Sequence, residues 1–113
     1  MTDQYSKNVK ALDLRVGALA KATPKVMGAY GQMVQSVMSE GAMDVKTKEL
    51  MALAISVAIR CDDCLVFHMR AAVKHGASEN EVIESLGVAV ELGGGPSVVY
   101  SARALEAYKE LAG

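Results

Sequence analysis

The sequence has little aromatic content, no tryptophan and no long apolar run. Aromatic residues make up 4% of the 113 residues, and proline occurs twice. The longest apolar run, residues 50–59, is interrupted once by serine and falls short of the roughly 20 residues that span a bilayer. The first ten residues, MTDQYSKNVK, lack the apolar core of a signal peptide. We therefore expect a cytoplasmic protein without a membrane segment.

An excess of charge of one sign is also missing, because 12 basic and 13 acidic residues give a net charge of −1. These residues are scattered, so no basic surface for phosphates forms and nucleic acid is not an expected partner. Small and flexible apolar side chains are abundant instead: hydrophobic residues make up 51% and include seven Met. We predict one domain over residues 1–113, and the apolar excess over one small core predicts a homo-oligomer.

Apolar residues recur at spacings of three and four along the whole chain, and no segment alternates as a strand does. We predict six helices, over residues 6–21, 24–40, 45–60, 61–75, 79–92 and 96–111. The connections between them are short, which indicates an all-α fold built as a compact bundle of about six helices. The segment 50–59 is apolar nearly all round, which predicts burial on most sides.

Four predicted helices have distinct apolar faces. The predicted faces are Val9, Leu12, Val16 and Leu19 in the first helix, Val26, Tyr30, Met33, Val34, Val37 and Met38 in the second, Leu65, Met69, Ala72 and Val73 in the fourth, and Val82, Ile83, Leu86 and Val90 in the fifth. Thr23, Asp44 and Ser78 are expected as N-caps, the last within a capping box that ends at Glu81. The glycines at 93–95 lack the strand and the Lys of a phosphate loop, so we interpret them as a close helix turn.

The most informative segment is Cys61-Asp62-Asp63-Cys64-Leu65-Val66-Phe67-His68. On a helix, the two cysteines and His68 share one face at the border of the apolar stripe, where a thiol is partly buried and still accessible. A spacing of three brings the Cα atoms to about 5–6 Å, within the range of a disulfide. Two cysteines this close in a cytosolic chain indicate redox or metal chemistry rather than a structural bridge.

The start of a helix favours thiolate formation at Cys61 and Cys64, and His68, four residues after Cys64, can exchange a proton with it. Asp62 and Asp63 oppose a neighbouring thiolate through their negative charge, so we expect a thiol of moderate acidity.

Glu49 is the fourth candidate residue. If the helices before and after residue 60 form an antiparallel hairpin, Glu49 faces about residue 72, one turn beyond His68. Its long carboxylate side chain can reach back to orient the imidazole, whereas reaching Cys61 would mean crossing roughly 18 Å. We therefore predict a Glu49–His68 contact; the alternative is a solvated acid in the first helical turn.

Other interpretations of the motif are haem attachment, a thioredoxin-type site and a metal site. Haem attachment requires His directly after the second cysteine, where this chain has Leu65, and a thioredoxin-type site requires a strand before the helix. Zinc would need a fourth ligand, but His75 lies about 10 Å beyond His68 along the helix. A redox dithiol is favoured over a metal site, no cofactor is expected, and His75 is interpreted as a C-terminal helix residue.

Glu49 followed by an apolar helix and Cys61-x-x-Cys64-x-x-x-His68 resembles the alkyl hydroperoxidase D-like branch of the carboxymuconolactone decarboxylase family. The resemblance covers about residues 45–105 and includes the segments KELMALAISVAIRCDDCLVFH and GVAVELGGGPSVVY. It implies an all-helical trimer or hexamer that reduces hydroperoxides or disulfides with electrons from a lipoyl-type or similar external thiol.

The resemblance also implies residue roles. Cys64 would attack the peroxide, Cys61 would resolve the sulfenic acid as a disulfide, and His68 with Glu49 would form the proton relay. Peroxidases of this type carry His before the second cysteine, where this chain has Asp63, which argues against fast peroxidase activity.

Three hypotheses follow. The first is an antioxidant enzyme, a peroxidase or disulfide reductase cycling through a Cys61–Cys64 disulfide. The second is a ring-opening decarboxylase like the family's namesake, against which the cysteine pair argues. The third is a non-enzymatic oligomer that responds to redox state.

Overall fold

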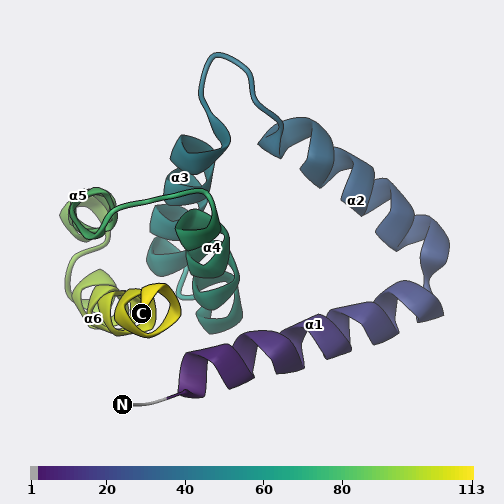
Figure 1. Ribbon diagram of the computed structural model, residues 1–113, viewed down its shortest axis with the longest axis horizontal. Helices are drawn as coiled ribbons and strands as arrows, with labels where there is room; N and C mark the ends of the chain where they lie inside the picture. The colour runs from purple at the N-terminus through teal and green to yellow at the C-terminus, as the bar shows by residue number, and fades with distance from the viewer. Residues whose placement is uncertain (1–2) are drawn as a thin grey trace.

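The computed structural model describes residues 3–113, which form six α-helices and no strand (Figure 1). The helices are α1 (Gln4–Ala22), α2 (Pro24–Met38), α3 (Val45–Ala58), α4 (Asp62–Lys74), α5 (Glu79–Gly93) and α6 (Gly95–Ala112). The all-α class and the number of helices are confirmed. The domain predicted over residues 1–113 includes two residues, 1–2, that lie outside the described part. Over residues 3–113, no helix is both long enough and apolar enough to cross a membrane.

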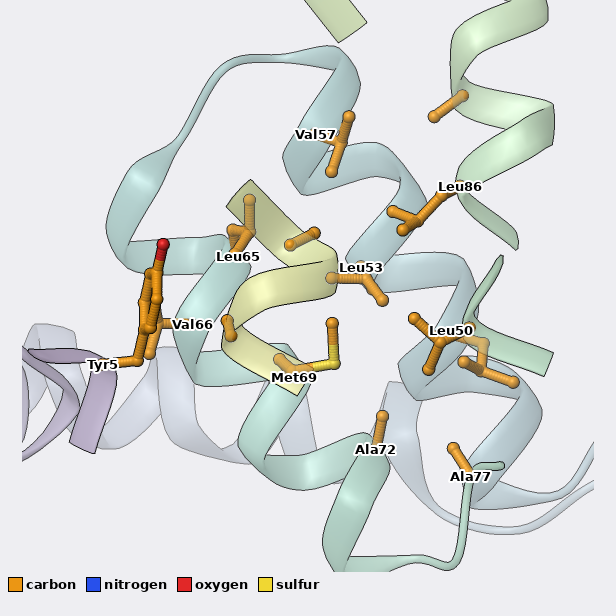
Figure 2. Packing of buried hydrophobic residues seen from close by; sticks show 14 of the residues in the cluster. Tyr5, Leu50, Leu53, Val57, Leu65, Val66, Met69, Ala72, Ala77 and Leu86 are labelled. Carbon is orange, nitrogen blue, oxygen red and sulfur yellow. The ribbon is translucent and has the colours of Figure 1, made fainter. Parts of the chain in front are cut away.

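Helices α3 to α6 pack around one apolar core (Figure 2). Leu53 of α3 and Met69 of α4 are fully buried and lie close together in its centre. Leu65 and Val82 are also fully excluded from solvent. Close burial of Leu, Val and Met side chains provides most of the stability of such a core, at about 1.5–3 kcal/mol for each fully buried side chain.

Helices α1 and α2 form an arm that leads away from this core (Figure 1). Tyr5 and Val9 of α1 are buried, but α2 has no buried residue at all. The apolar stripe predicted for α2 exists, yet Tyr30, Met33 and Val37 are each more than half exposed. In the first helix, the predicted face is buried at Val9, partly buried at Leu12 and exposed at Val16 and Leu19. The prediction is wrong at Val16 and Leu19 because the arm has already diverged from the core there.

The start of α1 is held against α6. The Tyr5 hydroxyl donates to Glu106 Oε1 at 2.5 Å, and the Glu110 carboxylate accepts the backbone N–H groups of Tyr5 at 3.2 Å and Ser6 at 2.7 Å. Glu110 therefore caps an N-terminus that would otherwise keep free N–H groups. Burial and the bond to Glu106 raise the pKa of Tyr5 to about 12.

Two predicted burial patterns are wrong. In α3, Leu53 is buried as expected, but Met51, Ile55 and Ile59 are exposed. Neighbouring helices cover only part of α3, and the uncovered side faces the arm or solvent. In α5, Ile83 is exposed because it lies at the edge of the predicted face, while Val82 is fully buried.

The predicted helix starts are largely confirmed. Asp44 accepts from the Thr47 N–H at 2.8 Å, and Ser78 and Glu81 form the expected capping box. The exception is Thr23, whose side chain makes no cap hydrogen bond. Helix α2 also ends at Met38 rather than near residue 40.

Candidate redox site

The site begins with the sharp turn that joins α3 to α4. Arg60 N–H donates to Val57 O at 3.1 Å, and Cys61 N–H donates to Ser56 O at 3.0 Å. These two bonds form a Schellman motif, in which the residue after the C-cap adopts a left-handed conformation. Arg60 occupies that position with φ 60, where glycine is usual. The same motif ends α4 with Gly76 at φ 86, so Arg60 is a strained residue directly before the first cysteine.

This turn makes Cys61 the N-cap of α4. Its Sγ accepts the backbone N–H of Cys64 at 3.1 Å, and the two cysteines form a disulfide with their Cα atoms 5.2 Å apart. The predicted proximity is confirmed. A sulfur at this position receives an N–H group and the positive end of the helix dipole, both of which stabilise negative charge. Both cysteines are half-buried.

His68 lies one turn after Cys64 on α4 and contacts Glu49 of α3. Its Nδ1 is 2.7 Å from Glu49 Oε1, which confirms the predicted contact. Glu49 is almost completely buried, and its neighbours Leu50 and Leu53 belong to the core. A buried carboxylate bonded to Nδ1 holds the ring orientation and favours the tautomer in which Nδ1 carries the proton. Nε2 is then the nitrogen that can take or return a proton.

The aspartates between the cysteines are both paired with arginines. Asp62 Oδ2 is 2.8 Å from Arg103 Nη1 of α6, and Asp63 Oδ2 is 3.3 Å from Arg15 Nη2 of α1. The sequence analysis found the aspartates but missed both arginines. Pairings across 41 to 48 residues leave no local signal in the sequence. The expected opposition of these carboxylates to a thiolate is therefore reduced by two guanidinium groups.

The surroundings of the site are partly apolar. Phe67 packs edge-on against the His68 ring, with centroids 5.2 Å apart, and Arg70 stacks over Phe67 at 5.5 Å. An open apolar groove of about 370 Å³ lies along α3, and Ala52, one turn after Glu49, is in its wall. Its other walls are formed by Val37, Met38, Met43, Lys48, Met51 and Ile55.

His75 is the C-cap residue of α4 and is exposed, in line with its interpretation as a helix-end residue. In the part of the chain that the structure describes, no three His, Cys, Asp or Glu side chains are grouped so as to hold a metal ion. Cys61, Cys64, His68 and Glu49 lie on α3, on α4 and at the turn between them.

The chain is similar in sequence to a known protein family and to individual bacterial proteins. Residues 24–107 match the model of the carboxymuconolactone decarboxylase family. An uncharacterised protein of Haemophilus influenzae is 45% identical over 108 residues, with 96% of each chain covered. Another, from Cupriavidus necator, is 32% identical over 111 residues and covers 98% of each chain.

Two solved structures are also similar. A carboxymuconolactone decarboxylase family protein from Legionella pneumophila has a TM-score of 0.96 at 39% identity, covering 99% of this chain and all of the other. One from Thermotoga maritima has a TM-score of 0.81 at 34% identity, covering 93% and 89%. The Thermotoga protein is described as having a possible role in the antioxidative response.

Proposed function

Because the chain belongs to the carboxymuconolactone decarboxylase family, we propose that it is a thiol-dependent oxidoreductase that cycles between the Cys61–Cys64 disulfide and the dithiol. The observation that carries the proposal is the disulfide at the start of α4 with a His68–Glu49 pair one turn away. The description of the Thermotoga relative supports the antioxidant direction. Such a cycle suits the cytoplasm, where thiols are kept reduced.

The oxidative half of the cycle consumes a hydroperoxide. The Cys64 thiolate attacks the terminal peroxide oxygen, the O–O bond breaks, and the alcohol leaves with a proton that His68 returns. Cys64 is then a sulfenic acid. The Cys61 thiol attacks its sulfur, water leaves, and the disulfide forms. Glu49 stabilises the imidazolium that forms when His68 takes a proton.

The reductive half needs an external dithiol of the lipoyl type. One reductant thiolate attacks Cys64 Sγ, and Cys61 leaves as a thiolate. The N–H of Cys64, which donates to Cys61 Sγ at 3.1 Å, is positioned to stabilise this leaving group. The second thiol of the reductant then releases Cys64 and closes the reductant's own disulfide, so two electrons and two protons enter the protein.

Asp63 favours disulfide reduction over fast peroxide reduction as the main activity. The carboxylate stands where a peroxidase of this type carries His, and it provides no cation to the attacking sulfur. A second candidate, ring-opening decarboxylation, is favoured by one observation, the His68–Glu49 pair, which can perform acid–base chemistry without cysteines.

We also propose that the chain works as a homo-oligomer, a trimer or hexamer. It exposes 7053 Å² of surface, whereas a monomer of 11.9 kDa exposes about 6,000 Å². The excess of about 1,000 Å² is similar to the roughly 800 Å² that each partner buries in a standard interface. The uncovered apolar side of α2 is the surface that a second copy would bury.

The enzyme proposal is tested by the turnover of cumene hydroperoxide and of a small disulfide with dihydrolipoamide as reductant. We expect turnover by the wild type, none by Cys64→Ser, and a loss of about 100-fold or more in His68→Gln. His75→Gln is the matched control, because it changes the other histidine, which is exposed at the far end of α4.

Equal slow turnover in the wild type and Cys64→Ser would overturn the enzyme proposal in favour of a redox-responsive oligomer. Turnover of a muconolactone that survives both Cys→Ser substitutions would instead support the decarboxylase. Each outcome therefore selects one of the three functions.

A further inference from the structure

Both residues between the cysteines are acidic, and each forms an ion pair with a different helix. Asp62 pairs with Arg103 of α6, and Asp63 pairs with Arg15 of α1. Arg103 is further held by stacking over the Tyr100 ring at 5.5 Å. The loop that carries the disulfide is therefore charge-paired on two sides, by helices that contribute nothing else to the site.

The two aspartates have opposite effects on the helix and on the sulfur. Carboxylates in the first turn of α4 stabilise the helix through its dipole. The same charges, one and two residues from Cys61, destabilise a thiolate on that residue. A cation on each carboxylate offsets its charge and so reduces the destabilisation of the thiolate.

We propose that Arg15 and Arg103 are positioning residues of the redox site, which offset the charges of Asp63 and Asp62 and so favour the reduced, thiolate form of the dithiol. The inference rests on the proposed function only in requiring that the disulfide be reducible. It does not depend on which substrate is turned over. Other charged or titratable groups in this region are Arg60 on the preceding turn, the His68–Glu49 pair, and Tyr5, which lines a hollow together with Asp62, Asp63 and Arg103.

The redox step that these arginines favour is balanced by a named reductant. Dihydrolipoamide gives two electrons and two protons to the Cys61–Cys64 disulfide and becomes the cyclic disulfide lipoamide. One of the new thiols then loses a proton to water. Removing the arginine charges makes this last step less favourable and moves the equilibrium toward the protein disulfide.

The ion pairs are partly exposed, so we expect small effects with opposite signs. In Arg15→Gln/Arg103→Gln, iodoacetamide should alkylate the reduced protein about two- to fourfold more slowly at pH 7, with the pH profile displaced upward. In Asp62→Asn/Asp63→Asn, alkylation should become faster by a similar factor. The combined variant should return close to wild type, and all differences should shrink in 1 M NaCl, where charges are screened.

The second readout is the equilibrium with dihydrolipoamide and lipoamide at pH 7.5. In the mixture that reduces half of the wild type, the arginine variant should be mostly oxidised and the aspartate variant mostly reduced. Lys7→Gln/Lys46→Gln is the matched control. It also removes two cations from ion pairs, Lys7–Asp3 and Lys46–Glu81, but neither pair includes a residue between the cysteines.

The inference is overturned if the arginine and aspartate variants shift in the same direction, or if neither shifts, since a structural role gives either result. If the arginine variant does not fold, the aspartate variant still decides, because a gain in reactivity that disappears in 1 M NaCl is an effect of charge and not of a loosened helix start. Arg103→Lys should retain most of the wild-type behaviour, because it keeps the positive charge. The proposed function fails separately from this inference. It fails if no dithiol reduces the Cys61–Cys64 disulfide, or if the wild type shows no turnover.

Discussion

The core of α3–α6 and the arm of α1–α2 have similar apolar content but very different burial. Every helix of the core contributes buried residues, whereas α2 contributes none. An isolated helix of 15 residues is marginal in water, so α2 needs a surface to cover its apolar side. The comparison teaches that the core is buried by contacts within one copy, whereas the apolar side of α2 is left uncovered and would be buried in the proposed oligomer.

The redox residues all belong to the first of these regions. Glu49 is on α3, and Cys61, Cys64 and His68 are at the turn or on α4. The arm contributes Arg15, which reaches Asp63 from α1. The proposed chemistry is thus placed on α3, α4 and the turn between them, and the arm contributes an ion pair rather than a reacting group.

The largest effect on stability should come from the core. Leu53→Ala removes a side chain that is 0% exposed and should lower the free energy of unfolding by about 2–5 kcal/mol. Ile55→Ala, on the same helix but 57% exposed, should cost far less in dilute protein. Urea unfolding of both variants measures the difference in the free energy of unfolding. Similar losses in the two variants would contradict the distinction between the covered and the uncovered side of α3.

The next effect concerns the arm. Met33→Glu/Val37→Glu places two charges on the apolar side of α2 and should raise the dissociation constant of the oligomer at least tenfold, because each buried apolar side chain contributes about 1.5–3 kcal/mol. Sedimentation velocity of the wild type and the variants measures the assembly state. Gln35→Glu, on the opposite side of α2, is the matched control and should leave it unchanged. A wild type that is monomeric at all concentrations would contradict this account of the arm.

Tyr5 marks the border between the two regions. Tyr5→Phe removes the hydrogen bond to Glu106 and should destabilise the protein by about 1 kcal/mol at neutral pH. Because the folded pKa is raised from 10.0 to about 12, the unfolded state ionises first, and stability falls as pH rises through that interval. Thermal unfolding at pH 7, 10 and 11 should show a smaller alkaline fall in Tyr5→Phe than in the wild type. An identical fall would mean that Tyr5 is not held as described.

The smallest expected effect is a gain in stability. Arg60→Gly should stabilise the protein by up to about 1 kcal/mol, because a residue with a Cβ is strained at φ 60 and glycine is not. Gly76, at the equivalent position after α4, provides the comparison: Gly76→Ala should lose stability. Guanidinium unfolding curves of the two variants should therefore move in opposite directions.

Much of the fold was predictable because its signals are local. Helix spacing and the caps at Asp44 and Ser78 depend on neighbours in sequence, and both appear as expected. The Glu49–His68 contact was predictable because an antiparallel hairpin determines which residues of its two helices face each other.

The rest depends on contacts between distant residues. The exposure of Ile55 depends on the direction in which the arm leaves the core. The ion pairs Arg15–Asp63 and Arg103–Asp62 depend on how α1 and α6 pack against α4. Arg60 was missed for a different reason: an arginine in a left-handed turn has no distinguishing pattern, whereas glycine there does.

The central claim is that Cys64 attacks the peroxide first and that Cys61 of the same chain then forms the disulfide with it. One equivalent of cumene hydroperoxide added to the fully reduced protein, followed by intact-mass analysis, tests it directly. The wild type should lose two hydrogens per chain, Cys61→Ser should gain one oxygen on Cys64, and Cys64→Ser should remain unchanged. Oxidation of Cys64→Ser at the wild-type rate, or disulfides between chains in place of the internal one, would contradict the account.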